Sequence, residues 1–203
     1  MYLNPIMDKK AKIQLDPLTL KIILFFIDQL DGVLGRTHLQ KLLFLTDLLS
    51  SKKLNKQLTN LDYTKFHFGP YSKKVQDYVK ALETKGLIKE REYTFLSDTN
   101  KKYSRFIISR KTGIREKLLE ELGPDTFVML DDVAKSFGNM TLNELLDFVY
   151  SLQMVKTSEK NEKLDTTKDK NGDLFEIMVK VKEKGMLNKE EQTSEDIDVL
   201  LNG

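Results

Sequence analysis

The sequence of 203 residues contains no cysteine and no tryptophan, and it has only two histidines. Without cysteine the chain has neither disulfides nor thiolate ligands for a metal or redox centre, which suits a reducing compartment. His38 and His67 lack a partner at the H-x-x-x-H spacing of metal ligands. We expect His38 on a helix surface, a structural role for His67, and neither a metal nor another cofactor.

Motifs of phosphate binding and hydrolysis are also missing. Gly32 and Gly35 stand alone, and no G-K-[ST] follows them, so no phosphate-cradling loop is predicted. No G-x-S-x-G nucleophile elbow occurs. Neighbouring carboxylates such as Glu120 and Glu121 take successive helix positions, which point apart. We therefore assign no catalytic residue and expect a protein that is not an enzyme.

Long apolar runs are absent as well. The longest, from Ile22 to Ile27, is about two helical turns, whereas a membrane span needs roughly 18 residues. The first twelve residues have no apolar signal core. We therefore expect no membrane contact and a cytoplasmic location.

The net charge of +2 is unevenly spread along the chain. From Val155 to Gly203 there are 9 Lys and 12 Asp plus Glu, so −3, which leaves 24 basic and 19 acidic groups, so +5, on the first 154 residues. A modestly basic body with an acidic tail is compatible with nucleic acid. A solvated, lysine-rich surface explains the same numbers.

Two helices are predicted near the beginning of the chain. Asp16 followed by Pro17 is typical of an N-cap and a first helical position, and apolar residues then run to Leu30. Thr37 and Gln40 have the spacing of a capping box, so a second helix should begin just after Thr37.

A strand, a corner and a third helix follow. Residues from Tyr63 to Phe68 alternate like a short strand, which Gly69-Pro70 ends. Ser72 is expected to cap a helix that runs to Lys85. The buried stripe of this helix has the i, i+3, i+4, i+7 spacing and consists of Val75, Tyr78, Val79 and Leu82.

A hairpin should come next. Gly86 is placed for a left-handed C-cap, with Leu87 closing on the last turn. Two β-rich runs, Ile88 to Leu96 and Tyr103 to Ser109, are joined by turn residues. Helix, strand, helix and hairpin in this order are typical of a winged helix-turn-helix, with the hairpin as the wing. We expect the two helices and the hairpin to share one core, made by Leu42, Val75, Val79 and Phe106.

The remaining chain divides into three parts. Further helices, one of them opened by a capping box at Thr141 and Glu144, complete a domain over residues 13–154. Residues 155–172 have almost no large apolar side chains and predict an exposed linker. Residues 173–203 should form an amphipathic helix and an acidic tail. The candidate partner-binding residues lie on this helix and are Leu174, Ile177, Met178 and Val181.

Leu39 to Leu45 reads L-Q-K-L-L-F-L, which resembles the L-Q-K-L-L-[YF] signature that opens the Panacea (SocA-like) antitoxin domain. In that family a strand leads to a Gly-Pro corner, similar to Phe68 to Ser72, and Phe137 to Tyr150 looks like the family's distal helix. The resemblance covers roughly Leu18 to Ser158. It is that of a distant relative, because the tryptophan often found before the corner is absent. It implies a winged-helix-like module that binds protein partners and, in some members, neutralises a toxin.

These observations predict a mostly helical α+β fold, with a winged-helix-like core, a β-hairpin wing and additional C-terminal helices. We expect a non-enzymatic binding module whose partner is a protein, either a toxin or a second copy of the chain. The alternative is a transcriptional regulator that binds duplex DNA. For that alternative the candidate residues come from the third helix and the wing, and they are Lys73, Lys74, Lys80, Arg91, Lys101, Lys102 and Arg105.

Overall fold

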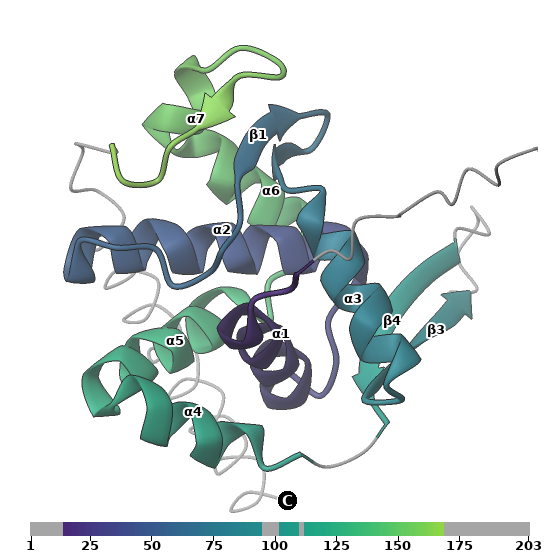
Figure 1. Ribbon diagram of the computed structural model, residues 1–203. Coiled ribbons are helices and arrows are strands. Elements are labelled where there is room, and N and C mark those ends of the chain that lie inside the picture. Colours follow the sequence, from purple (N-terminus) through teal and green to yellow (C-terminus); the bar gives the residue numbers. More distant parts are fainter. Residues whose placement is uncertain (1–13, 95–101, 110–111, 169–203) are drawn as a thin grey trace, which may run out of the picture.

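The computed structural model describes residues 14–94, 102–109 and 112–168. In these ranges, seven helices and two small antiparallel sheets share one hydrophobic core (Figure 1). The fold is therefore α+β and mostly helical. The amphipathic helix and acidic tail expected over residues 173–203 lie outside the described residues.

The helices are α1 (Pro17–Gln29), α2 (Gly35–Leu54), α3 (Lys74–Thr84), α4 (Ile114–Leu122), α5 (Pro124–Phe137), α6 (Leu142–Ser151) and α7 (Gln153–Thr157). One sheet has the strand order β2-β1-β5, with β1 (Tyr63–Phe66), β2 (Gly69–Tyr71) and β5 (Lys163–Leu164). The other sheet pairs β3 (Ile88–Thr94) with β4 (Lys102–Ile108).

Helix α2 occupies the middle of the molecule. It contacts α1 and α5, α3 and α6, and strands of both sheets (Figure 1). Because neighbours surround it, every residue from His38 to Ser51 is buried, the polar ones included. His38 is therefore inside, and the expected surface position was wrong. Burial lowers the pKa of His38, so its ring is neutral at pH 7.

The expected capping box of α2 is also wrong. The helix begins at Gly35, whose φ is +67°, and its N-cap, Leu34, makes no side-chain cap hydrogen bond. The side chain of Gln40 is used elsewhere, on the backbone of Ser72. Ser72 in turn does not cap α3, whose N-cap is Lys73 without a side-chain cap bond. A long-range contact between Gln40 and Ser72 has thus replaced the two helix caps that were expected locally.

Other helix ends follow the sequence signals. Asp16 caps α1 by accepting a hydrogen bond from the Thr19 backbone N–H at 2.7 Å, and Pro17 takes the first position. Thr141 and Glu144 form both bonds of the capping box of α6. After α3, the Leu87 N–H donates to the Leu82 carbonyl at 3.0 Å. With Gly86 at a φ of +65°, this is the predicted Schellman ending.

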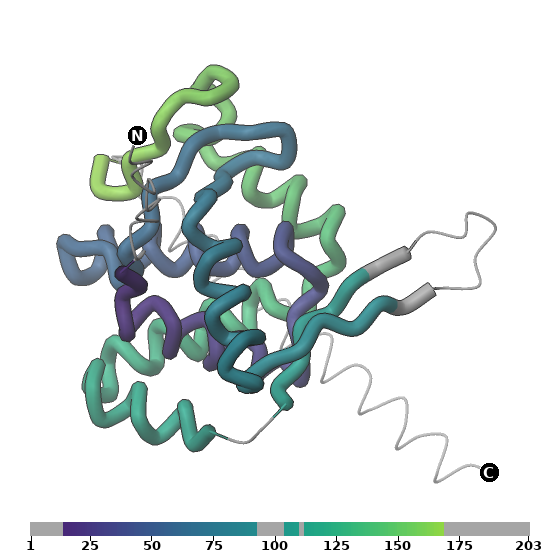
Figure 2. The backbone as a smooth tube through the Cα atoms, turned by 45° about the vertical axis from the view of Figure 1, so that its right-hand side comes forward, coloured from purple at the N-terminus to yellow at the C-terminus, as the bar shows by residue number. Residues whose placement is uncertain are grey.

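The β3–β4 hairpin forms where it was predicted. It extends away from the helices (Figure 2), with Ile88 opposite Ile108 at its base. Val33, between α1 and α2, adds an isolated bridge to β4. The Val33 and Phe106 backbones exchange hydrogen bonds of 3.0 and 2.9 Å. This bridge ties the hairpin to the connection between the first two helices.

The single strand expected from Tyr63 to Phe68 is instead a tight hairpin. β1 turns at His67 and Phe68 and returns as β2, with Phe66 opposite Gly69. Gly69 takes a φ of +80°, which glycine adopts at little cost. The Gly-Pro corner is thus the start of a strand, and Phe68 stands at the hairpin tip.

The first part of the expected linker, residues 155–168, docks on the domain through three buried residues, while most of its other residues are exposed. Val155 and Leu164 belong to the core, and Thr166 is buried within 3.3 Å of the Ser51 hydroxyl. β5 pairs with β1, placing Leu164 opposite Tyr63. Backbone pairing and a few buried residues suffice for docking, although the apolar content is low. Residues 169–172 lie outside the described part.

The expected shared core is confirmed, since Leu42, Val75, Val79 and Phe106 are all buried in the same cluster.

Replacing Val79 with aspartate should unfold the domain. Val79 is buried in the core, and an unpaired charge there should cost more than about 4 kcal/mol. Lys80→Asp, at the next and exposed position, is the matched control and should leave the melting temperature nearly unchanged. Thermal unfolding followed by circular dichroism measures both. A Val79→Asp protein that melts within a few degrees of the wild type would contradict the assigned core.

Candidate functional site

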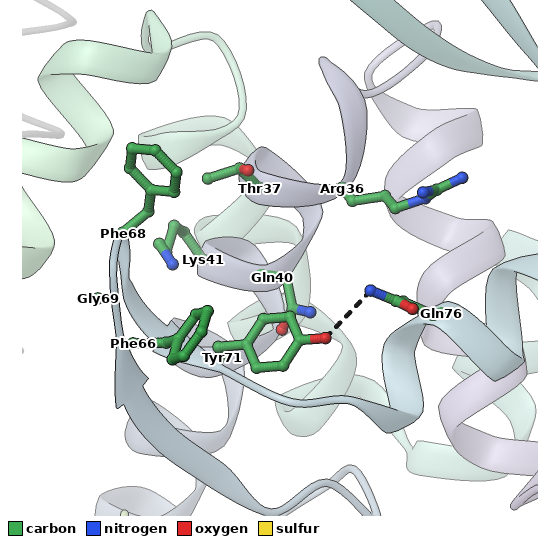
Figure 3. A pocket seen from close by; sticks show the side chains of 9 residues that line it. All are labelled: Arg36, Thr37, Gln40, Lys41, Phe66, Phe68, Gly69, Tyr71 and Gln76. Atoms are coloured by element: carbon green, nitrogen blue, oxygen red, sulfur yellow. Dashed lines mark hydrogen bonds between the residues drawn. The ribbon is translucent and has the colours of Figure 1, made fainter. Parts of the chain in front are cut away.

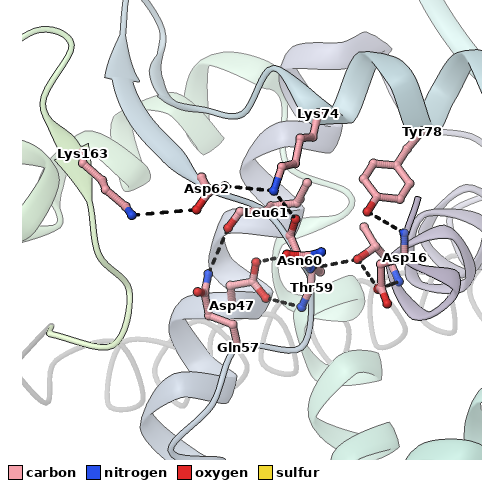
Figure 4. Close-up of polar contacts among 11 residues, drawn as sticks. Asp16, Asp47, Gln57, Thr59, Asn60, Leu61, Asp62, Lys74, Tyr78 and Lys163 are labelled. Atoms are coloured by element: carbon pink, nitrogen blue, oxygen red, sulfur yellow. Dashed lines mark hydrogen bonds and ion pairs between the residues drawn. The ribbon is translucent and has the colours of Figure 1, made fainter. Parts of the chain in front are cut away.

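Helix α2 carries buried polar side chains whose partners lie in the chain that follows it. The Asp47 carboxylate accepts hydrogen bonds from the Leu58 and Thr59 backbone N–H groups at 3.1 and 2.8 Å. It also accepts from the Thr59 hydroxyl and from the Tyr63 hydroxyl, the latter at 2.8 Å. These contacts fold the loop after α2 back onto the helix (Figure 4).

Burial raises the pKa of Asp47 to about 6, against the opposite effect of its donors from Thr59, Tyr63 and Leu58. At pH 7 the group is therefore mostly ionised, and in that form it can only accept hydrogen bonds. Both carboxylate oxygens of Asp47 are thus used for structure.

The same loop is tied to other helices. Lys74 of α3 donates to the Asp62 carboxylate at 2.9 Å, and the Asn60 N–H donates to the Thr19 hydroxyl at 3.0 Å (Figure 4). Tyr78 accepts from the Asp16 N–H at 3.0 Å. The approach to the β1–β2 hairpin is thereby fixed by three helices.

Two further side chains of α2 hold the far side of the hairpin. The Gln40 amide bonds both backbone groups of Ser72, donating at 2.8 Å and accepting at 2.9 Å. Lys41, with only 2% of its surface exposed, donates from Nζ to the Pro70 carbonyl at 2.7 Å. Burial lowers the pKa of Lys41 to about 7. Two consecutive residues of α2, Gln40 and Lys41, thus hold the end of the hairpin by hydrogen bonds.

A pocket of about 310 Å³ opens between α2, the hairpin and α3. Figure 3 shows the amine of Lys41 between the rings of Phe66 and Phe68, while Arg36 points away on the side of Gln76. The residues that line it are Arg36, Thr37, Gln40, Lys41, Phe66, Phe68, Gly69, Tyr71 and Gln76. Among the described residues, its lining includes three aromatic rings and no carboxylate.

Two rings at this pocket are unusually open to solvent. Phe66 is 42% exposed, and Phe68, at the hairpin tip, is 62% exposed. Tyr71 lies 5.6 Å from Phe66 and accepts a hydrogen bond from Gln76 at 3.0 Å. We call Phe66, Phe68, Tyr71 and Lys41 the hairpin face. Large aromatic groups beside a hollow are typical of places where proteins bind one another.

Two of the proposed DNA-binding residues have partners within the protein. Lys74 pairs with Asp62, and Arg105 donates to the Leu30 carbonyl at 3.3 Å. Lys73 and Lys80 are exposed on α3, and Arg91 is exposed on β3. Lys101 and the side chain of Lys102 are outside the described part.

The partner-binding candidates Leu174, Ile177, Met178 and Val181 also fall outside the described residues.

The sequence analysis did not predict the hairpin face, although the pattern of α2 contains a signal for the burial of Lys41. The leucines of α2 occur on all sides of the helix, so a glutamine, a lysine or an aspartate between them has to be buried. The exposure of Phe66 and Phe68 had no such signal, because alternation along a strand does not reveal a tight turn.

Within the described ranges, no group of three or more His, Asp or Glu side chains is arranged to hold a metal. No helix among the same residues is long and apolar enough to cross a membrane.

A central helix, a hairpin bonded to it and a pocket with exposed rings make up the candidate site. The model of the antitoxin SocA-like, Panacea domain family matches residues 39–155, which is more than half of the chain. The chain therefore belongs to this non-enzymatic family. Searches of curated proteins and of solved structures found no match. Membership in an antitoxin family implies a toxin as the partner.

Removing the Asp47 carboxylate should strongly destabilise the fold. Asp47→Ala leaves buried donors of Leu58, Thr59 and Tyr63 unsatisfied, at a cost of about 3–5 kcal/mol. Asp62→Ala, which removes an exposed carboxylate, is the control and should cost less than about 1 kcal/mol. Urea unfolding measures both, and equal losses would show that Asp47 does not anchor the loop.

Lys41 should make stability depend on pH above neutrality. Its pKa is about 7 in the folded protein and about 10.4 in the unfolded chain, so the unfolded state binds more protons between these values. Stability therefore rises with pH in this window, by roughly 1 kcal/mol per unit. Lys41→Met should lack the rise. Urea unfolding from pH 7 to pH 10 tests this, and parallel curves for the two proteins would contradict it.

Proposed function

We propose that this protein is an antitoxin-like module that binds a protein toxin through the hairpin face. The observation that carries the proposal is the exposure of Phe66 and Phe68 beside a pocket, on a hairpin that α2 holds rigidly. Rigid aromatic groups contribute much binding energy because little conformational entropy is lost when they are covered.

The order of elements supports a winged-helix-like core for this module. α1, the Val33 bridge, α2, α3, β3 and β4 follow one another as the elements of a winged helix do, with Val33 in place of the first strand. The β1–β2 hairpin is then an addition between the second and third helices. The addition carries the hairpin face, which is why we place partner binding there and not on the wing.

Binding of duplex DNA remains the alternative proposal. It is supported by the exposed lysines Lys73 and Lys80 on α3 and by Arg91 on β3. Against it, Lys74 and Arg105 are engaged within the protein, and α3 carries no arginine to read guanine. A toxin partner therefore has the stronger support.

Residues 173–203 remain a proposed second contact region. The stripe of Leu174, Ile177, Met178 and Val181 could cover the domain itself, a second copy or the toxin. In the last case it would add to the contact made by the hairpin face.

Removing the two exposed rings should abolish neutralisation. A library of genes from the same cell, expressed with and without this protein, identifies a toxin as a gene whose growth arrest the protein relieves. Phe66→Ser with Phe68→Ser should weaken binding of that toxin by roughly 100-fold, as measured by calorimetry, and relief of growth arrest should be lost.

The matched control is Leu119→Ser with Val128→Ser, which removes exposed apolar groups, 45% and 56% exposed, from α4 and α5. If the control loses binding and the hairpin variant keeps it, the assigned face is wrong. If no toxin gene is found and the protein is retained on duplex DNA at low salt, the DNA alternative replaces the proposal.

A further inference from the structure

Among the described residues, Lys41 is a buried basic group to which the fold gives no counter-ion. Its ammonium has three donors, and the bond to the Pro70 carbonyl uses one. No carboxylate of the described residues forms an ion pair with it. A buried ammonium without a counter-ion is costly, and Lys41 could have been replaced by an apolar residue if it served packing alone.

The surroundings of Lys41 favour an anion. Thr37, from the first turn of α2, lines the same pocket, and the positive end of the helix dipole lies there. The Nζ atom of Lys160 lies over the ring of Phe66, 5.9 Å from the ring centre. The described lining has no acidic side chain that would repel an anion or already neutralise the lysine.

The geometry also limits what the anion can be. The Arg36 guanidinium is 3.2 Å from Glu90, so it is not poised as a second clamp on a doubly charged phosphate. One ammonium between aromatic rings matches a singly charged carboxylate attached to an apolar stem. An aspartate or glutamate on the surface of a folded protein has this chemistry.

We propose that the Lys41 pocket binds the carboxylate of an aspartate or glutamate side chain of the toxin, while Phe66 and Phe68 cover the neighbouring apolar part of that toxin. This rests on the proposed function, because it specifies what the hairpin face recognises. Covering the pocket would give Lys41 its missing counter-ion and strengthen the pair by excluding water.

The test uses 3-phenylpropionate as a probe, because it joins one carboxylate to one apolar ring, and 3-phenylpropionamide as its uncharged control. The full chain carries lysine labelled with ¹³C at the ε position, and NMR follows the Lys41 signal. We expect the acid to shift this signal saturably and to raise the pKa of Lys41, since a bound anion favours the protonated form. The amide should bind at least about tenfold more weakly.

Lys41→Met provides the second measurement, with its thermal unfolding checked first. At pH 6.5 calorimetry should show at least about tenfold weaker binding of the acid and unchanged binding of the amide. Equal binding of acid and amide by the wild type, or of the acid by wild type and variant, would overturn the proposal. A larger Lys41 shift with inorganic phosphate than with the acid would overturn the assignment to a carboxylate.

These results are separable from the proposed function. If Phe66→Ser with Phe68→Ser loses neutralisation while the wild type does not prefer the acid to the amide, the hairpin face binds a toxin without a buried carboxylate. If the acid is preferred but Lys41→Met neutralises the toxin as well as the wild type, the pocket is real and the toxin does not use it, so the proposal fails.

Discussion

The fold depends on one helix that is buried on all sides and still carries polar groups. Packing α2 against neighbours on every face leaves Gln40, Lys41 and Asp47 without water, so each must find a partner inside the protein. Their partners are the backbone and hydroxyl groups of the chain that follows α2. The requirement that buried polar groups be bonded therefore dictates where that loop and the β1–β2 hairpin lie.

This gives the sequence from Leu39 to Leu43 a physical meaning. In L-Q-K-L-L the leucines pack the core, the glutamine fixes Ser72, and the lysine fixes Pro70. Gln40 and Lys41 of this sequence thus hold the β1–β2 hairpin against α2. The helix differs from an ordinary amphipathic helix, in which polar side chains at these positions would face solvent.

Local signals in the sequence predicted the structure correctly wherever the hydrogen-bond partners of a residue lie within a few positions of it. The cap at Asp16, the capping box at Thr141 and the left-handed turn at Gly86 were predictable for this reason. Thr37 with Gln40 has the same spacing as a capping box, but Gln40 gains more by bonding both groups of Ser72, 32 residues away. Residues 155–168 were misjudged for a related reason, because β5 gains its place through backbone pairing with β1, which composition does not record.

The same contacts bear on the proposal of a protein partner. Some charges that could have faced a phosphate backbone already have a partner in the protein: Lys74 pairs with Asp62 and Arg36 with Glu90 at the surface, and Arg105 donates to the Leu30 carbonyl. Elsewhere, the described residues present two exposed phenylalanines beside one recessed amine. Such a surface gains most when a protein covers it, because burial of the rings is favourable in itself and the water it expels strengthens any charge pair formed beneath them.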